Sequence, residues 1–219
     1  MKKIYIVLLV IMLTAIAGAS FAAPQFLYNF SKQKVGSYPK GWRSWPFQGS
    51  KVRKIYHVKE ENGQKFINAF DDQDISQQIF LNFIWPIKEK PMLSWSWRAT
   101  TLPEGGNESN DQMNDSACGL YIVVGKYSGH AMKYIWSTTL APGTIVTRKE
   151  GKLKMKVLDT GPDKKGTWVH HKVDIRKDYK ELFGKDLNKN PSGIALLTDG
   201  NAVHKPAGCD YKEFAISEN

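Results

Sequence analysis

Short runs of alternating apolar and polar residues, separated by turn signals, recur along nearly the whole chain and constrain its fold most strongly. The clearest pair is at residues 53–59 and 64–70, joined by Asn62-Gly63, a dipeptide typical of tight β-hairpins because it readily adopts positive φ. Helical periodicity is almost absent, and one short helix is predicted at 176–183, ended by Gly184. Further strands are predicted at 76–82, 92–100, 119–126, 132–139, 144–148, 152–159, 167–175, 193–199 and 210–217. The pattern predicts an all-β fold: a two-sheet antiparallel β-sandwich of jelly-roll type with one short helix.

The first 22 residues have the charged, apolar and small-residue order of a secretory signal peptide. Lys2 and Lys3 precede an apolar run from Ile4 to Ile16, and Ser20 and Ala22 fit the −3 and −1 positions of a cleavage site. We therefore expect cleavage after Ala22, with residues 23–219 forming a single β-sandwich domain. The alternative is a membrane anchor, but the apolar run is short for a bilayer core of about 30 Å. The sequence predicts an exported protein, periplasmic or extracellular, that does not span a membrane.

The chain is basic, with a formal net charge of +10, and two of its positive charges belong to the predicted signal peptide. Such a charge favours anionic partners, namely acidic glycans, lipid headgroups or nucleic acid. The lysines are spread along the chain, so we favour solubility as their main role. Nucleic acid is not expected as a partner, because no reading helix or zinc module is present.

One lysine-rich stretch has a regular pattern. Residues 152–157 alternate lysine with Leu153, Met155 and Val157, which predicts a half-buried strand. We interpret its lysine face as an outer face that protects a sheet edge.

The chain has two cysteines, Cys118 and Cys209, which predict a disulfide in an exported protein. The bridge would be favoured if the strands 119–126 and 210–217 were neighbours; the alternative is two separate buried thiols. No metal site is expected, because the five histidines lack metal-binding spacing and His170-His171 would point to opposite faces of a strand. No cofactor is expected either. A structural calcium at the oxygen-rich segments 71–74 or 107–115 is less favoured than solvated turns.

A series of motifs resembles a known bacterial family. In chain order the motifs are GSYPKGW at 36–42, LSWSWRATTLPEGGNESNDQMNDSACGLYIVV from 93, MKYIWS, DYKELFG, GIALLTDGN and CDYKEFAI. Together they resemble the family known as domain of unknown function number 3047. The resemblance implies an exported or envelope protein with a sandwich similar to galactose-binding and carbohydrate-binding jelly rolls, and it brings no settled activity.

Carried over by position, the polar pattern of this family falls on seven residues of the chain: Arg98, Asp115, Tyr134, Trp136, Asp178, Asp199 and Tyr211. The chain departs from the pattern after Asp199, where it has Gly200-Asn201-Ala202, and this weakens an acidic site at that loop. It also departs by having cysteines at 118 and 209, which suggests a local disulfide.

Five residues are the candidate ligand-binding set: Arg98, Asp115, Tyr134, Trp136 and Asp199. Alternation places Arg98 opposite Trp95 and Trp97, which we expect in the core, and an arginine can grip a carboxylate bidentately. A structural pair of Arg98 with Asp115 at the loop base is the slightly favoured alternative. Tyr134 and Trp136 share one strand face, which would suit a glycan groove, although core packing is favoured for each aromatic taken alone.

The sequence favours binding over catalysis. Asp115, Asp199 and Glu213 could supply a glycosidase pair, but their spacing does not show proximity, and no GxSxG nucleophile motif is present. Catalytic residues are therefore left unassigned. The favoured function is a non-catalytic, exported β-sandwich that binds a glycan or an anionic envelope component. The alternatives are a polysaccharide hydrolase or lyase and a structural envelope protein. The deciding observation is whether the five candidate residues share one open pocket.

Overall fold

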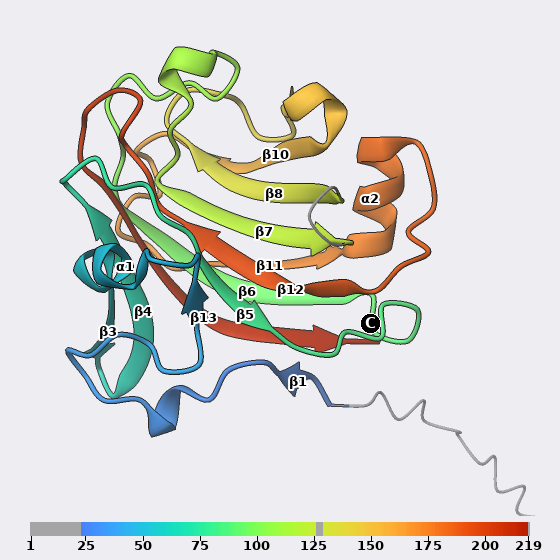
Figure 1. The fold of residues 1–219 in the computed structure, drawn as a ribbon, viewed down its shortest axis with the longest axis horizontal. Helices are drawn as coiled ribbons and strands as arrows, with labels where there is room; N and C mark the ends of the chain where they lie inside the picture. Colours follow the sequence, from blue (N-terminus) through green and yellow to red (C-terminus); the bar gives the residue numbers. More distant parts are fainter. Residues whose placement is uncertain (1–22, 126–128, 219) are drawn as a thin grey trace, which may run out of the picture.

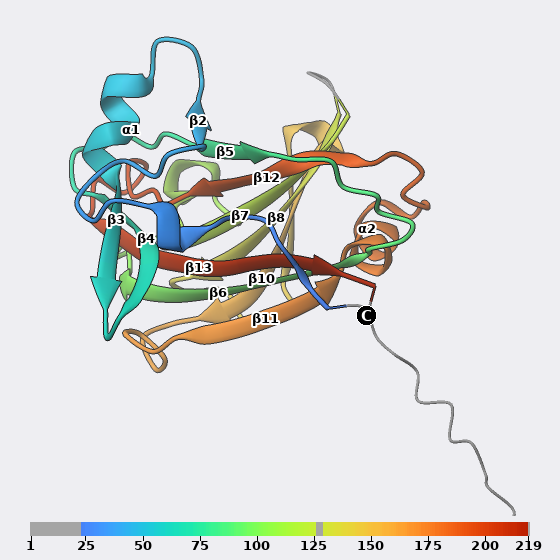
Figure 2. The same ribbon diagram turned by 90° about the horizontal axis from the view of Figure 1, so that it is seen from below.

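The computed structural model describes residues 23–125 and 129–218, so the predicted signal peptide at 1–22 lies outside the described residues. Two β-sheets face each other as two layers, which Figure 2 shows in the view from below, and Figure 1 shows the same fold from another direction. The β-sandwich predicted from the alternating pattern is confirmed.

Sheet I has the strand order β11-β6-β13-β4-β3, with the short β1 paired to β13. Its strands are β1 (Gln25–Phe26), β3 (Tyr56–Glu61), β4 (Gln64–Asp71), β6 (Met92–Thr101), β11 (Val169–Asp174) and β13 (Ala207–Ser217). Asn62 and Gly63 have φ of 51° and 76°, so the predicted hairpin turn joins β3 to β4.

Sheet II has the strand order β2-β5-β12-β7-β8-β10-β9. Its strands are β2 (Arg43–Ser44), β5 (Ile79–Asn82), β7 (Cys118–Val124), β8 (His130–Ser137), β9 (Ile145–Arg148), β10 (Leu153–Thr160) and β12 (Pro191–Leu197). One pair, β8 with β10, is parallel, because the chain passes from β8 to the outer strand β9 and then returns as β10 between them. The sheet is therefore mixed, where the sequence predicted only antiparallel pairing.

In the described part of the chain, two α-helices flank the sheets. The predicted one is α2 (Ile175–Phe183): Asp174 caps its first turn by accepting hydrogen bonds from two backbone amides, and Gly184 ends it with φ of 67°. The second, α1 (Gly49–Ile55), was not predicted, because it is only seven residues long and buries only Val52 and Ile55. Its last three residues, 53–55, lead directly into β3, and for this reason the sequence pattern places them in the predicted strand 53–59.

The core lies between the two sheets and is rich in aromatic side chains. Trp95 and Trp97 on β6 are fully buried, as predicted, and Trp95 stacks on Tyr134 of β8 with ring centroids 5.4 Å apart. Tyr211 of β13 crosses from sheet I to sheet II, where its hydroxyl accepts a hydrogen bond from the Gly119 amide at 3.0 Å. Such contacts fix which face of each strand points inward.

The interpretation of β10 as an edge strand with an outward lysine face was wrong. Leu153, Met155 and Val157 belong to a separate apolar cluster on the outer face of sheet II, with Ile135 and Val146. The lysines alternate to the other side, where Lys156 forms ion pairs with α2. Both sides of this strand therefore have partners, and β9 forms the edge of the sheet.

Cys118 and Cys209 form a disulfide, with their Cα atoms 5.3 Å apart. Cys118 begins β7 in sheet II and Cys209 lies on β13 in sheet I, so the bridge joins the two layers and not two neighbouring strands of one sheet. Both sulfur atoms lie in the main core.

Candidate functional site

A row of side chains crosses the outer face of sheet II at one level. Strand register pairs Arg43 with Phe80, Phe80 with Ala195, Ala195 with Tyr121, Tyr121 with Lys133 and Lys133 with Met155. Directly paired residues of neighbouring strands share one face of a sheet. The row therefore forms the floor of one continuous surface that six strands build together.

This surface is hollowed into a groove, which we call the sheet II groove. It consists of two adjoining hollows of about 490 Å³ and 760 Å³. Residues lining both hollows join them: Trp45, Gln78, Tyr121, Lys149 and Leu153. The combined size and the mixed polar and apolar lining suit a small-molecule or oligomeric ligand.

The two walls of the groove carry its most exposed groups. On one wall Trp45 is 51% exposed and meets Phe80 edge-on, with ring centroids 4.8 Å apart. On the other wall Lys149 begins the short 3₁₀ helix η3 (Lys149–Gly151), where Lys149 and Glu150 have φ of 50° and 53°. Positive φ is costly for residues other than glycine, so the fold holds this turn in an unfavourable backbone conformation at the wall of the groove.

Lys133 is a buried cation at the floor of the smaller hollow, and it is only 2% exposed. Its Nζ donates a hydrogen bond to Ser116 Oγ at 2.9 Å and lies 5.2 Å from the centre of the Tyr121 ring. Burial lowers its pKa, but Tyr121 and the carboxylates of Asp199 and Glu108 more than offset this, so the pKa lies above its usual value. Lys133 therefore keeps its positive charge.

Gly119 gives the Lys133 side chain the space that it needs. A Cβ at position 119 would lie 2.5 Å from Cε of Lys133 and 2.8 Å from the Leu197 carbonyl oxygen. Only glycine leaves that space free, so the position of the buried ammonium depends on a residue of the neighbouring strand.

Asp199 lies at the same end of the groove and is 5% exposed. Its carboxylate accepts hydrogen bonds from the Ser116 amide and the Ser76 hydroxyl, both at 3.4 Å. Burial raises its pKa to about 6, with Lys133 opposing the rise and Asp115 adding to it. The carboxyl group therefore changes protonation in the mildly acidic range.

Of the five predicted ligand-binding residues, only Asp199 lines the groove. Arg98 lies on the outer face of sheet I, where it pairs with Asp210 at 2.7 Å and Glu61 at 2.8 Å. The predicted partner, Asp115, is instead buried in the loop before β7 and accepts a hydrogen bond from the Val203 amide at 2.8 Å. The pairing of Arg98 with Asp115 was therefore wrong.

The two predicted aromatic residues lie in the core. Tyr134 donates a hydrogen bond to Asp178 of α2 at 2.6 Å, and the Trp136 indole donates to the Gly161 carbonyl at 3.1 Å. Both side chains are fully buried. The five residues thus do not share one open pocket, and their assignment as ligand-binding residues stays a prediction.

The sequence patterns do not indicate most residues of the groove. Arg43, Trp45 and Phe80 come from short or irregular segments that carry little periodicity. Lys133 is the exception, because its position in the sequence is unusual for a lysine. It follows Met132 and precedes Tyr134 and Ile135 on a strand whose two faces are both largely apolar. A lysine at such a position has to be buried with partners or line a site.

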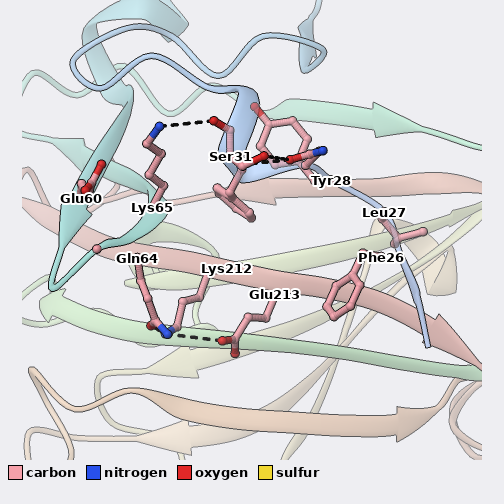
Figure 3. Close-up of a pocket in the computed structure, with 12 residues that line it drawn as sticks. Phe26, Leu27, Tyr28, Ser31, Glu60, Gln64, Lys65, Lys212 and Glu213 are labelled. Atoms are coloured by element: carbon pink, nitrogen blue, oxygen red, sulfur yellow. Dashed lines mark hydrogen bonds and ion pairs between the residues drawn. The ribbon is translucent and has the colours of Figure 1, made fainter. Parts of the chain in front are cut away.

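A second hollow, of about 940 Å³, lies over the outer face of sheet I (Figure 3). We call it the sheet I hollow; the N-terminal segment 26–31 covers one side of it. Both lysines that line it have partners nearby: Lys65 donates to the Gln33 carbonyl at 2.8 Å, and Lys212 donates to the Gln64 side chain at 2.6 Å. The cations of this hollow are therefore already engaged within the protein.

No group of three or more histidine, cysteine or acidic side chains that could hold a metal ion occurs in the described residues. At the acidic segment 71–74, Asp71 accepts hydrogen bonds from the amides of Gln73, Ile75 and Ser76. The segment is thus organised as a turn around one carboxylate. Within 23–125 and 129–218, no helix has both the length and the apolar character needed to cross a membrane.

A family model described as "Protein of unknown function (DUF3047)" matches residues 40–215. The chain belongs to this family. The match covers every described residue of the sheet II groove, from Arg43 to Asp199, whereas the N-terminal segment over the sheet I hollow precedes it. No curated protein matches the sequence.

Solved structures with a similar fold include a family 29 carbohydrate-binding module, at 10% identity and a TM-score of 0.39, covering 90% of this chain and 89% of that chain. Another is the xyloglucanase domain of NopAA, a type three effector from Sinorhizobium fredii, in complex with cellobiose. It has 9% identity and a TM-score of 0.43, and the match covers 84% of this chain and 95% of that chain. Neither similarity says what this DUF3047 member binds.

Proposed function

We propose that the protein binds a glycan chain in the sheet II groove and does not cleave it. The observation that carries this proposal is the exposed Trp45 ring, which Phe80 holds at the wall of an open groove. A sugar presents apolar C–H faces beside its hydroxyl groups, and aromatic rings offer a large, rigid apolar surface for such faces. Trp45 and Phe80 together form an exposed aromatic patch in a concave surface, and such patches mark binding sites more often than single exposed rings do.

The other side chains of the groove complement a hydroxyl-rich ligand. Amides and hydroxyls can both donate and accept hydrogen bonds, as sugar hydroxyls require. Residues of this kind lie along the whole groove: Ser44, Gln77, Gln78, Asn82, Asn114 and Ser192. The mixture of a few aromatic rings with many neutral polar groups supports a saccharide over a purely apolar ligand.

The acidic groups of the groove support binding over hydrolysis. A glycosidase needs two carboxyl groups on either side of the scissile bond. Asp111 and Asp199 are the acids among the described lining residues, and Asp111 forms an ion pair with Arg148. Both lie in the smaller hollow, so the described lining of the larger hollow, which contains Phe80, includes no carboxylate.

A hydrolase is the second candidate, and one observation favours it. The pKa of Asp199 is raised to about 6, which suits a group that donates a proton near neutral pH. In that case Asp111 would have to act as the second carboxylate. Release of reducing ends from a bound polysaccharide would support this candidate and contradict the binding proposal.

The proposal includes export to the periplasm or the cell exterior. The Cys118–Cys209 disulfide supports this, because disulfides persist in oxidising compartments. A glycan-binding protein would meet its ligand there.

The test is titration of the protein with a panel of soluble polysaccharides, comparing wild type with Trp45→Ala. We expect binding to weaken by about 30-fold, because a central tryptophan commonly contributes about 2 kcal/mol at a binding site. The melting temperature should hardly change, since the Trp45 side chain is half exposed.

The matched control is Phe26→Ala. Phe26 is another exposed aromatic residue, at 69%, but it lines the sheet I hollow. Its removal should leave glycan affinity at the wild-type level. Equal affinity of wild type and Trp45→Ala, or no binding of any polysaccharide in the panel, would rule out the proposed function.

A further inference from the structure

All the charged residues among the described lining of the larger hollow of the sheet II groove are positive. Three basic residues line it, Arg43 on one wall and Lys149 and Lys152 on the other, and the described lining residues include no carboxylate. In the described part of the chain, none of these three side chains forms an ion pair within 4.0 Å. Their charges are thus available to a ligand.

The positive character continues into the smaller hollow. Lys133 at its floor is hydrogen-bonded to the neutral Ser116 hydroxyl, and among the described residues it forms no ion pair within 4.0 Å, although Asp199 and Glu108 act on it from further away. Arg148 offsets the charge of Asp111 through their ion pair. Asp199, with a pKa of about 6, loses its negative charge in mildly acidic conditions. The groove as a whole therefore carries a surplus of positive charge.

The basic residues flank the aromatic and neutral polar ones. Arg43 pairs in register with Phe80, so its side chain leaves β2 on the same face of the sheet as the Phe80 ring. Lys152 immediately precedes Leu153, which lines both hollows from the opposite side. A ligand that lies over Phe80 and Tyr121 thus passes between cations on its two sides.

We propose that the ligand is an anionic polysaccharide whose sugars carry carboxylate groups, that is, a chain of uronic acids. This proposal rests on the proposed glycan binding. The neutral amides would meet its hydroxyls, Trp45 would meet a ring face, and Arg43, Lys149 and Lys152 would meet carboxylates along the chain. An arginine can donate two parallel hydrogen bonds to one carboxylate, which suits a chain that carries carboxylates along its length. A duplex nucleic acid or a lipid surface would satisfy the charges but not the aromatic floor between them.

The experiment compares the affinity of the protein for a charged and an uncharged form of the same polysaccharide. Wild-type protein is titrated with polygalacturonate and with the same polymer after full methyl esterification, which removes the charge and keeps the sugar. We expect polygalacturonate to bind at least about 10-fold more tightly at low salt, with the difference shrinking as salt is added. Alginate, hyaluronate, neutral xyloglucan, DNA and phosphatidylglycerol vesicles complete the panel.

The variants are Arg43→Gln, Lys149→Gln and Lys152→Gln, singly and together. Each exposed charge pair accounts for up to about a fivefold change in affinity, so the triple variant should lose about 10-fold or more for uronate chains and little for neutral ones. Lys59→Gln is the control, because it removes one exposed charge from β3 in sheet I. All of these variants change exposed side chains, so we expect them to fold normally.

The outcomes separate the two proposals. Equal binding of a charged polymer and its uncharged form, or of neutral xyloglucan alone, would overturn the uronate assignment and keep glycan binding. Full affinity in the triple variant would also overturn it, as would DNA or vesicle binding as tight as that of the uronates. If no polysaccharide binds, the proposed function itself fails.

Discussion

The sheet I hollow and the sheet II groove are both open surfaces lined by aromatic rings and lysines, but their charges are arranged differently. On sheet I the cations have partners: Lys212 in the hollow donates to Gln64, and Arg98, outside the hollow on the same face, pairs with Asp210 and Glu61. On sheet II, Arg43 and Lys149 have no ion-pair partner among the described residues, and Lys133 is held by a neutral hydroxyl. The sheet I hollow is larger than either hollow of the sheet II groove taken alone, so volume does not distinguish the two surfaces as the charges do.

The difference indicates which surface contributes to stability and which is kept for a ligand. A buried charge with a fixed partner cannot lose that partner without a large loss of stability, and it has little left to offer another molecule. A buried or clustered charge without such a partner lowers stability, and it is expected where a ligand completes the site. The two faces should therefore respond to substitution in opposite ways.

The largest effect should come from the covalent link that both faces share. The disulfide joins β7, next to Gly119, to β13, next to Asp210, and closes a loop of 91 residues. Replacing Cys118 and Cys209 with serine should lower the free energy of unfolding by about 4 kcal/mol, because the open chain gains conformational entropy. Urea unfolding of the variant and of the wild type measures the loss.

Reduction of the wild type provides the control for this prediction. With reductant present, the wild type should unfold at the urea concentration of the serine variant, and groove binding should fall only through the unfolded fraction. Two titratable free thiols in protein from an oxidising compartment would contradict the bridge.

Local patterns in the sequence predicted the fold well, because strands and turns are encoded by near neighbours. Alternation and the Asn62-Gly63 turn predicted β3 and β4, and Asp174 and Gly184 are ordinary helix-end residues around α2. The helix α1 was missed because seven residues with two buried positions show no period. The two-residue strand β2, which carries Arg43, is shorter still.

The groove could not be predicted in the same way, because it depends on which face of β8 points outward. Tyr134 and Trp136 occupy one face of this strand, and Lys133 and Ile135 occupy the other. Both faces are buried, one in the main core and one in the second cluster, so composition does not distinguish them. The sequence favoured a groove on the aromatic face, whereas the structure has it on the face with the lysine. The register of six strands, set by long-range pairing, decides this.

The next largest effect concerns the paired charges of sheet I. Arg98→Met should lower the free energy of unfolding by about 3 kcal/mol, because it leaves the Asp210 carboxylate, only 4% exposed, without its cation. Arg43→Met in the groove is the matched variant and should change stability by less than about 0.5 kcal/mol. Thermal unfolding of the two variants compares the faces directly.

A double variant checks the cause of this loss. Replacing Asp210 with asparagine in the Arg98→Met background should restore most of the stability, since no buried charge then remains unpaired. If Arg98→Met keeps the wild-type melting temperature but loses glycan binding, the contrast between the faces is wrong and the site includes Arg98.

The smallest effect has the opposite sign and concerns Asp199 in the groove. Its pKa is about 6 in the folded protein and near 3.9 in the unfolded chain, so the folded state binds more protons between these values. Stability attributable to this group therefore falls as pH rises from about 4 to 7, by about 3 kcal/mol in total. Asp199→Asn removes this penalty of about 3 kcal/mol. The amide keeps only part of the hydrogen bonding, so the net stabilisation of the protein at pH 7.5 should be about 2 kcal/mol.

At pH 4.5 the variant and the wild type should unfold at nearly the same urea concentration. A variant that is less stable than the wild type at pH 7.5 would show that Asp199 and Lys133 form a stabilising pair like those of sheet I, and the distinction between the two faces would be lost.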